Sequence, residues 1–285
     1  MNLIDVLVAI QILIAFPIGV YIFGGTKVTW PGTKQMVDRY RYHFFLLILI
    51  TVVKALSRKW EQPMEGIFSI DFTPMIYGFE GNSVFWVQNS LQHPAMTFFM
   101  AFIYIGSFLF IMVFSVLIFT YMDMRKIASK LIFLYLVLFL IMIPFYFFVV
   151  VYTPSYPKMF YPEANSLVSG MEPLLYNYGP HINKFFMDYD TFNNCFPSMH
   201  IGYPAAILFI ICMDVKGFRG YKYFLLAMLF LIGLSIIYLG IHWLTDIVGG
   251  LLFAMVAAVI VEYKAHNFWR RIHRLDCWLR RHFKT

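Results

Sequence analysis

The chain contains seven long apolar runs separated by more polar segments. No other feature of the sequence restricts its possible folds as much. The runs cover residues 3–22, 42–56, 96–121, 131–152, 198–213, 223–240 and 244–261. A helix needs roughly 20 mainly apolar residues to cross the hydrocarbon layer of a bilayer. The chain is 61% hydrophobic and 13% charged, whereas a soluble domain is close to half apolar and about a quarter charged. We therefore predict an all-α integral membrane protein with about seven transmembrane helices.

The first two runs allow more than one interpretation. The run 3–22 has no cationic stretch before it and no small-residue cleavage site near its end. We interpret it as a retained membrane anchor rather than a signal peptide. The run 42–56 is short and carries Lys54 near its end, so it could be a re-entrant or interfacial segment instead of a full span.

The distribution of Lys and Arg tests the number of spans. Seventeen of the 22 cationic residues fall in the segments 23–41, 122–130, 214–222 and 262–285. Seven spans place these segments on one side, and the positive-inside rule makes that side cytoplasmic. The C-terminus is then cytoplasmic, while the N-terminus and the long loops 57–95 and 153–197 are extracytoplasmic. The net charge of +7 accordingly indicates topology and contact with anionic lipids, not nucleic-acid binding.

The C-terminal tail, residues 264–285, combines apolar residues at helical spacing with several arginines. This pattern predicts a basic amphipathic helix on the inner membrane surface. The sequence has no internal repeat or separate soluble domain, so we predict that residues 1–263 form one polytopic membrane domain. Cys195, Cys212 and Cys277 are expected outside, within a span and inside, so no disulfide or cysteine-based metal site is predicted.

Two polar clusters lie at the predicted extracytoplasmic boundary. One is PSMH, residues 197–200, where the fifth run begins. The other joins the sixth and seventh runs and contains Ser235, Tyr238, Gly240, His242 and Asp246. His242 and Asp246 are four residues apart, so on a helix they share one face. The carboxylate can accept the N–H of one ring nitrogen and leave the other nitrogen free to attack.

Three further features favour phosphate chemistry at this boundary. His200 offers a second imidazole for proton transfer, because the unperturbed pKa of histidine, about 6.5, is near neutral pH. Ser198 and the backbone N–H groups at a helix start can bind an anion. Gly249 and Gly250 permit close helix packing behind the site. The clusters therefore predict a phosphate site with a nucleophilic histidine, an acid histidine and an anion cradle.

These clusters resemble the second and third signatures of the type 2 phosphatidic acid phosphatase superfamily, P-S-x-H and S-R-x5-H-x3-D. The form FPSMHIG…YLGIHWLTDIVGG looks most like the inositol phosphorylceramide synthase branch. The resemblance implies a six-helix phosphatase-type core over about residues 96–262, together with the first span. It also implies a phosphohistidine mechanism, in which His242 attacks phosphorus, Asp246 orients it and His200 protonates the leaving oxygen.

The sequence departs from the superfamily pattern at two places. Ser235 of the third signature is present, but Ile236 stands where an arginine is expected. The first signature, K-x6-R-P, is absent, and in both departures the chain resembles the inositol phosphorylceramide synthase branch. We expect Lys158 to supply a cation to the phosphate, and we place Ser235 and Tyr238 with Ser198 in the substrate site. Other candidates for the cation are Lys184, Arg58 and Lys59.

We therefore predict a membrane-embedded lipid phosphatase or phosphotransferase whose active site is extracytoplasmic, in a prokaryotic plasma membrane. Its substrate would be a lipid phosphate or diphosphate or a phospholipid, with a polar hydroxyl compound as a potential acceptor. The sequence leaves the choice between hydrolase and transferase open. Candidates for an acceptor-binding rim on the first outer loop are Glu80, Asn82 and Gln88.

Other function classes fit the sequence less well. A seven-span transporter or receptor with proton-sensing histidines would carry polar residues near the midplane, whereas these gather at one boundary. A catalytically inactive scaffold would not need to retain both histidines and the aspartate. Metal binding by His200, His242 and Asp246 is disfavoured because no pattern such as H-E-x-x-H accompanies them. We predict neither a metal nor another cofactor.

Overall fold

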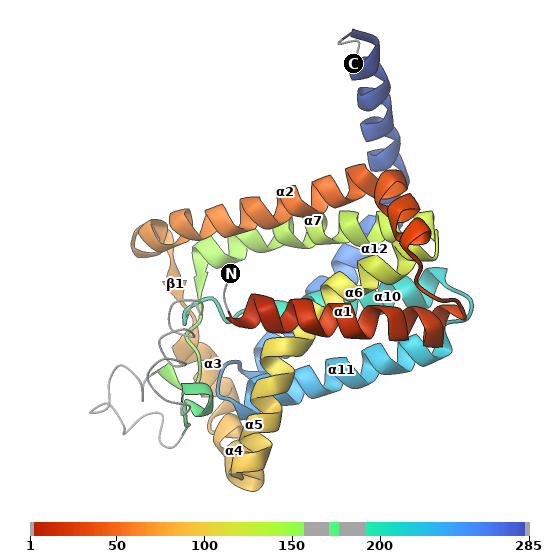
Figure 1. Cartoon of the computed structure of the whole chain (residues 1–285). Coiled ribbons are helices and arrows are strands. Elements are labelled where there is room, and N and C mark those ends of the chain that lie inside the picture. The colour runs from red at the N-terminus through yellow and green to blue at the C-terminus, as the bar shows by residue number, and fades with distance from the viewer. Residues whose placement is uncertain (1–2, 157–170, 177–191, 283–285) are drawn as a thin grey trace.

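The computed structural model describes residues 3–156, 171–176 and 192–282, and it consists mainly of long helices packed side by side (Figure 1). Each of the seven apolar runs falls mainly within a helical stretch. These stretches are α1 (Leu3–Gly24), α2 (Trp30–Phe68), α5–η1–α6 (Pro94–Tyr121), α7 (Arg125–Phe148), α10 (Met199–Asp214), α11 (Arg219–Tyr238) and α12 (Leu244–His282). The predicted all-α architecture is thus confirmed.

Four helical stretches of the described chain are long and apolar enough to cross a membrane. They are Pro94–Tyr121, Arg125–Phe148, Arg219–Tyr238 and Leu244–Ile272. The apolar helices Ile10–Gly24 and Met199–Asp214 are shorter. The number of seven spans therefore stays a prediction.

Helix α2 contains the run 42–56, whose interpretation was open. The Thr29 hydroxyl caps it by accepting from the Gly32 N–H at 3.2 Å, and the helix continues for 39 residues. Its first turns run at an angle to the long part that lies beside α7 (Figure 1). The helix lies beside α7 and does not turn back (Figure 1). Residues 42–56 therefore belong to one continuous helix, and their position relative to the membrane stays a prediction.

Residues 94–121 contain a local distortion that apolar patterning did not predict. A π-helical turn, η1 (Ile103–Ser107), separates α5 (Pro94–Phe102) from α6 (Phe108–Tyr121). Gln11 of α1 packs against this turn, since a Cβ on Gly106 would lie 2.8 Å from its Nε2. Such turns often occur at functional sites, and η1 contributes to the site described below.

Helix α10 packs against α6, α7, α11 and α12, and most of its side chains are buried. Its approach to α12 depends on the absence of side chains in the second helix. A Cβ on Gly250 would lie 2.5 Å from the Ser198 carbonyl oxygen, and one on Gly249 would lie 2.6 Å from the Phe196 ring. The predicted role of this glycine pair in close packing is confirmed.

The end of the bundle near the start of α12 carries a layer of short elements. The run 131–152 was predicted as a helix, but α7 ends at Phe148 and Val149–Val150 form strand β2. This strand pairs in parallel with β1 (Ile70–Asp71), as suits β-branched residues that favour extended backbone. Helices α3 (Thr73–Glu80) and α4 (Ser83–Leu91) and the turn η3 (Leu174–Tyr176) complete this layer.

The basic tail is the continuation of α12, which runs unbroken from Leu244 to His282. Its C-terminal part extends beyond the other helices (Figure 1). The tail is helical up to His282, as predicted. Its location on the inner membrane surface and the division of the chain at residues 263 and 264 stay predictions.

Candidate active site

The turn between α11 and α12 positions His242. Gly240 has φ = +75°, and a Cβ there would lie 2.7 Å from the Glu172 carbonyl oxygen. After this glycine the N–H groups of Ile241 and His242 both donate to the Ile236 carbonyl oxygen, at 3.0 and 3.1 Å. His242 therefore lies in the turn before α12, and the expectation that it shares a helix face with Asp246 was wrong in this detail.

The predicted pair of His242 and Asp246 nevertheless forms a hydrogen bond. His242 Nδ1 lies 3.0 Å from Asp246 Oδ2, and the same oxygen accepts from the Trp243 N–H at 2.9 Å. Asp246 is in the first turn of α12 and reaches back to the start of its helix, as the acid of a capping box does. This bond places the proton of the neutral imidazole on Nδ1 and the lone pair on Nε2.

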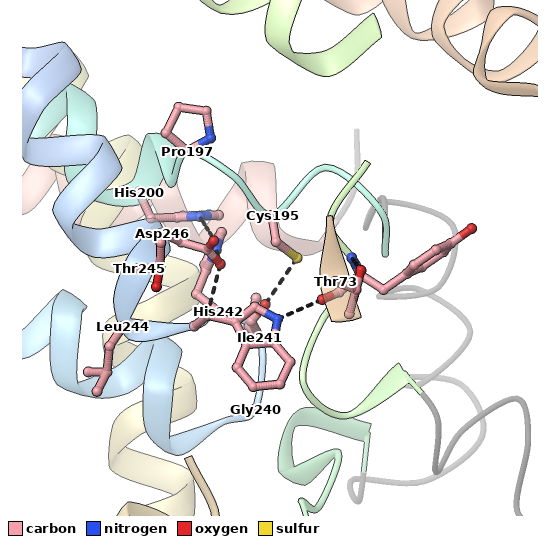
Figure 2. Close-up of polar contacts among 12 residues, drawn as sticks. Thr73, Cys195, Pro197, His200, Gly240, Ile241, His242, Leu244, Thr245 and Asp246 are labelled. Carbon is pink, nitrogen blue, oxygen red and sulfur yellow. Dashed lines mark hydrogen bonds and ion pairs between the residues drawn. The ribbon is translucent and has the colours of Figure 1, made fainter. Parts of the chain in front are cut away.

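His200 faces the free nitrogen of His242 (Figure 2). Its Nδ1 lies 3.4 Å from His242 Nε2. The His200 ring packs against Tyr104 of η1 and Phe108 of α6, with centroids 4.8 Å away in both cases. His200 belongs to the first of the two polar clusters in the sequence and His242 to the second. The fold therefore brings both clusters into one site.

Ser198 joins the starts of α10 and α12. Its backbone N–H donates to the Asp246 carbonyl oxygen at 3.0 Å. Ser198 stands at the N-cap position of α10, but its side chain makes no capping hydrogen bond. Within the described chain its fully buried hydroxyl has no hydrogen-bond partner, and neither has Asp246 Oδ1. Unpartnered buried polar atoms are uncommon, and these two flank the histidine pair along the chain.

Ser235 and Tyr238, the other predicted substrate ligands, bond to the helices around them. The Ser235 hydroxyl donates to the Ile232 carbonyl oxygen at 2.8 Å. The Tyr238 hydroxyl lies 2.7 Å from Thr97 Oγ1. Both residues are fully buried, and the structure does not bring either side chain into a hydrogen bond with the histidine pair. Their role in substrate binding stays a prediction.

The structure does not test the predicted cations. Lys158 and Lys184 fall outside the described residues, and so do the side chains of Arg58 and Lys59. Ile236, which replaces the expected arginine, is fully buried in the main apolar core. That position therefore contributes a backbone carbonyl to the turn instead of a positive charge to the site.

Glu80 is a residue of the site whose position sequence reasoning missed. Its carboxylate accepts from the backbone N–H groups of Leu244 and Thr245, at 2.9 and 2.5 Å, so it caps α12 beside the catalytic candidates. No spacing in the sequence links residues so far apart. The expected acceptor rim is not formed as a unit, since Gln88 is buried and bonds to the backbone of Glu172.

Cys195 also reaches the site. It is buried, and its Sγ donates to the Ile241 carbonyl oxygen at 3.3 Å (Figure 2). Its sulfur and one ligand atom each of His242 and Asp246 lie within 4.8 Å of one another, so the three could hold a metal ion. An ion there would replace the hydrogen bond that orients His242. The prediction of a metal-free site is therefore kept as a prediction.

Comparison with known proteins gives the family of the chain. A family model described as PAP2 superfamily matches residues 77–260, which include His200, His242 and Asp246. No match was found among curated proteins or among solved structures. The alternatives of a transporter, a receptor or an inactive scaffold gain no support from this result. With the match covering more than half of its length, the chain belongs to the PAP2 superfamily, whose members are membrane-associated enzymes of the phosphatase type.

Proposed function

We propose that the protein moves the phosphoryl group of a lipid phosphate, lipid diphosphate or phospholipid, at the extracytoplasmic face, through a phosphohistidine on His242. One observation carries this proposal, the chain of contacts from Asp246 through both nitrogens of His242 to His200. The buried carboxylate directs the proton of His242 to Nδ1, and the nitrogen that remains basic faces the second imidazole.

In the first step, His242 Nε2 attacks phosphorus and the bond from phosphorus to the leaving oxygen breaks. His200, in its protonated form, gives its proton to that oxygen, so the alcohol or phosphate leaves neutralised by one proton. The positive charge that develops on His242 is balanced by Asp246, as in other nucleophile–base–acid arrangements. The phosphoryl group is then bonded to Nε2.

In the second step, an acceptor hydroxyl attacks the phosphohistidine. His200, now neutral, takes the proton of that hydroxyl, the P–N bond breaks and His242 is restored. With water as acceptor the protein is a hydrolase, which releases phosphate from a lipid phosphate and the phosphorylated head group from a phospholipid. With a polar alcohol it is a transferase and forms a phosphoester, as the resemblance to the inositol phosphorylceramide synthase branch suggests.

The position of the site favours a lipid substrate. His200 and His242 lie at the starts of α10 and α12 or directly before them, so a head group at this boundary leaves its acyl or prenyl tails beside the apolar helices. The orientation with the site outside rests on the distribution of Lys and Arg. Lys158 remains a proposed cation on that side.

The test uses purified wild-type protein beside His242→Ala and His200→Ala, with a panel of labelled lipid phosphates and phospholipids, with and without inositol or another hydroxyl acceptor. We expect both variants to lose roughly a thousandfold or more of the activity. The exposed His266 on the same helix as Asp246 supplies the matched control His266→Ala, which should retain wild-type rates. Free phosphate as product identifies a hydrolase, and a new phosphoester that requires the acceptor identifies a transferase. Activity that survives the loss of His242 would refute the phosphohistidine route.

A further inference from the structure

The Lys54 side chain is directed towards α10, the helix that carries His200, although no signature contains this lysine. It is the one Lys or Arg that falls within any of the seven apolar runs. In the structure its Nζ is 5.6 Å from the centroid of the Tyr203 ring. Tyr203 is on α10, one turn after His200, and it is buried. The ammonium group of α2 is thus turned towards the helix that carries the acid histidine.

A lysine within an apolar run is energetically unfavourable, so its presence there indicates a function. An ionisable group within a membrane span is rare and generally functional, because a charge is unfavourable in the hydrocarbon layer. The attraction between a cation and the face of a tyrosine ring stabilises this orientation of the side chain.

The proposed reaction requires a positive charge near this place. Negative charge spreads over the phosphoryl oxygens in the transition state, and a positioned cation stabilises it. The arginine position of the third signature cannot provide one here, because Ile236 is part of the apolar core. A lysine has a flexible stem of four carbons, so its ammonium group can swing from the Tyr203 ring towards a phosphate bound between the histidines.

We propose that Lys54 is a phosphate-binding residue of the active site, taking over from α2 the charge that the superfamily signatures would otherwise supply. The ligand it binds is the anionic phosphoryl oxygen of a phosphate ester. This inference rests on the proposed function for the place of the phosphate, but it includes no bond-making step by Lys54 itself. It also gives the second apolar run a function in the site, not only in the membrane.

The test is equilibrium binding of orthovanadate, a phosphate analogue, to the purified full-length protein by isothermal titration calorimetry. Lys54→Met should weaken binding by about tenfold or more, the effect of losing a hydrogen bond to a charged group. Lys54→Arg keeps a positive charge and N–H donors, so its affinity for vanadate should stay within about threefold of that of wild type. Lys216, exposed in the loop after α10, provides the control Lys216→Met with unchanged binding. Lys54→Gln serves in parallel should the methionine variant fail to fold.

The outcomes separate this inference from the proposed function. Equal vanadate affinity in wild type, Lys54→Met and Lys54→Gln would overturn the role of Lys54, and so would a wild-type protein that binds no vanadate. The phosphohistidine route fails by another result, namely lipid phosphatase activity that persists in His242→Ala. A protein that needs Lys54 for vanadate and yet turns over without His242 would keep the binding site and exclude the covalent intermediate.

Discussion

Two polar clusters lie along α10 and α12, one at the start of both helices and the other at the end of α10, and they differ in how their charges are matched. In the inner cluster, Lys130 of α7 forms ion pairs with Asp214 of α10 and Glu262 of α12, and Lys126 also pairs with Asp214. In the outer cluster, formed by His200, His242 and Asp246, the carboxylate bonds to the His242 ring. The other nitrogen of that ring faces the His200 ring.

The two clusters also differ in how completely their polar atoms are hydrogen-bonded. Of the buried side-chain atoms without a partner in the described chain, none belongs to the inner cluster, whereas Ser198 Oγ and Asp246 Oδ1 belong to the outer one. A buried charge with opposite charges beside it joins helices, and its loss is felt as instability. Buried groups that lack partners are suited to a ligand that supplies them. The inner cluster should therefore affect folding, and the outer one catalysis.

The sharpest test of this division is Asp246→Asn. Asparagine keeps the size of the side chain but loses the charge that balances a cationic His242, and it can present an N–H to Nδ1 and thereby select the wrong tautomer. By analogy with the orienting aspartate of serine proteases, we expect activity to fall by about 10³–10⁴-fold. The melting temperature in detergent should change little. The exposed Asp38 of α2 gives the control Asp38→Asn, and near-normal turnover by Asp246→Asn would contradict the assignment.

Lys130→Met tests the opposite cluster. The Lys130 side chain is only 6% exposed. Its removal leaves Asp214 with Lys126 and leaves Glu262, which is 39% exposed, without this partner, so we expect a loss of about 1–2 kcal/mol in the free energy of unfolding. Activity per folded molecule should stay close to that of wild type. Thermal unfolding monitored by size-exclusion chromatography, with Lys216→Met as the exposed control, measures the first quantity. A variant as stable as wild type but inactive would reverse the comparison.

How well the sequence predicts a contact in these clusters depends on how far apart the two residues are in the chain. His242 and Asp246 are close in the chain, so their hydrogen bond was predictable, although the turn after Gly240 placed His242 before the helix. The apposition of His200 followed from the shared boundary of two spans. The inward direction of Lys54 and the capping by Glu80 were not predictable, because helix rotation and the packing of distant loops leave no local spacing in a sequence.

Glu80→Gln tests one of these long-range contacts. Its carboxylate caps the first turn of α12, where negative charge is favourable, and a lost cap costs about 1 kcal/mol. Because the same turn holds Asp246, we expect kcat to fall about fivefold, with a small decrease in melting temperature. Asp71, whose Oδ1 caps α3 by accepting from the Thr73 N–H at 2.8 Å, supplies the comparison Asp71→Asn. An equal loss of kcat in both variants would show that catalysis depends on helix capping throughout the layer of short elements, and not specifically on the cap at the site.

The smallest effect, and the finest test of the comparison, is expected from Ser198→Ala. Because the Ser198 hydroxyl is buried and has no partner among the described residues, its removal should leave the melting temperature unchanged or slightly higher. If the hydroxyl binds a phosphoryl oxygen, KM for a lipid phosphate should rise by about three- to tenfold, the effect of one hydrogen bond. Ser90→Ala, at an exposed serine that donates to the Trp86 carbonyl oxygen, controls for loss of a hydroxyl elsewhere. A lower melting temperature with unchanged KM would instead make Ser198 a helix cap in solution, and the outer cluster would then resemble the inner one more closely than its unpartnered atoms imply.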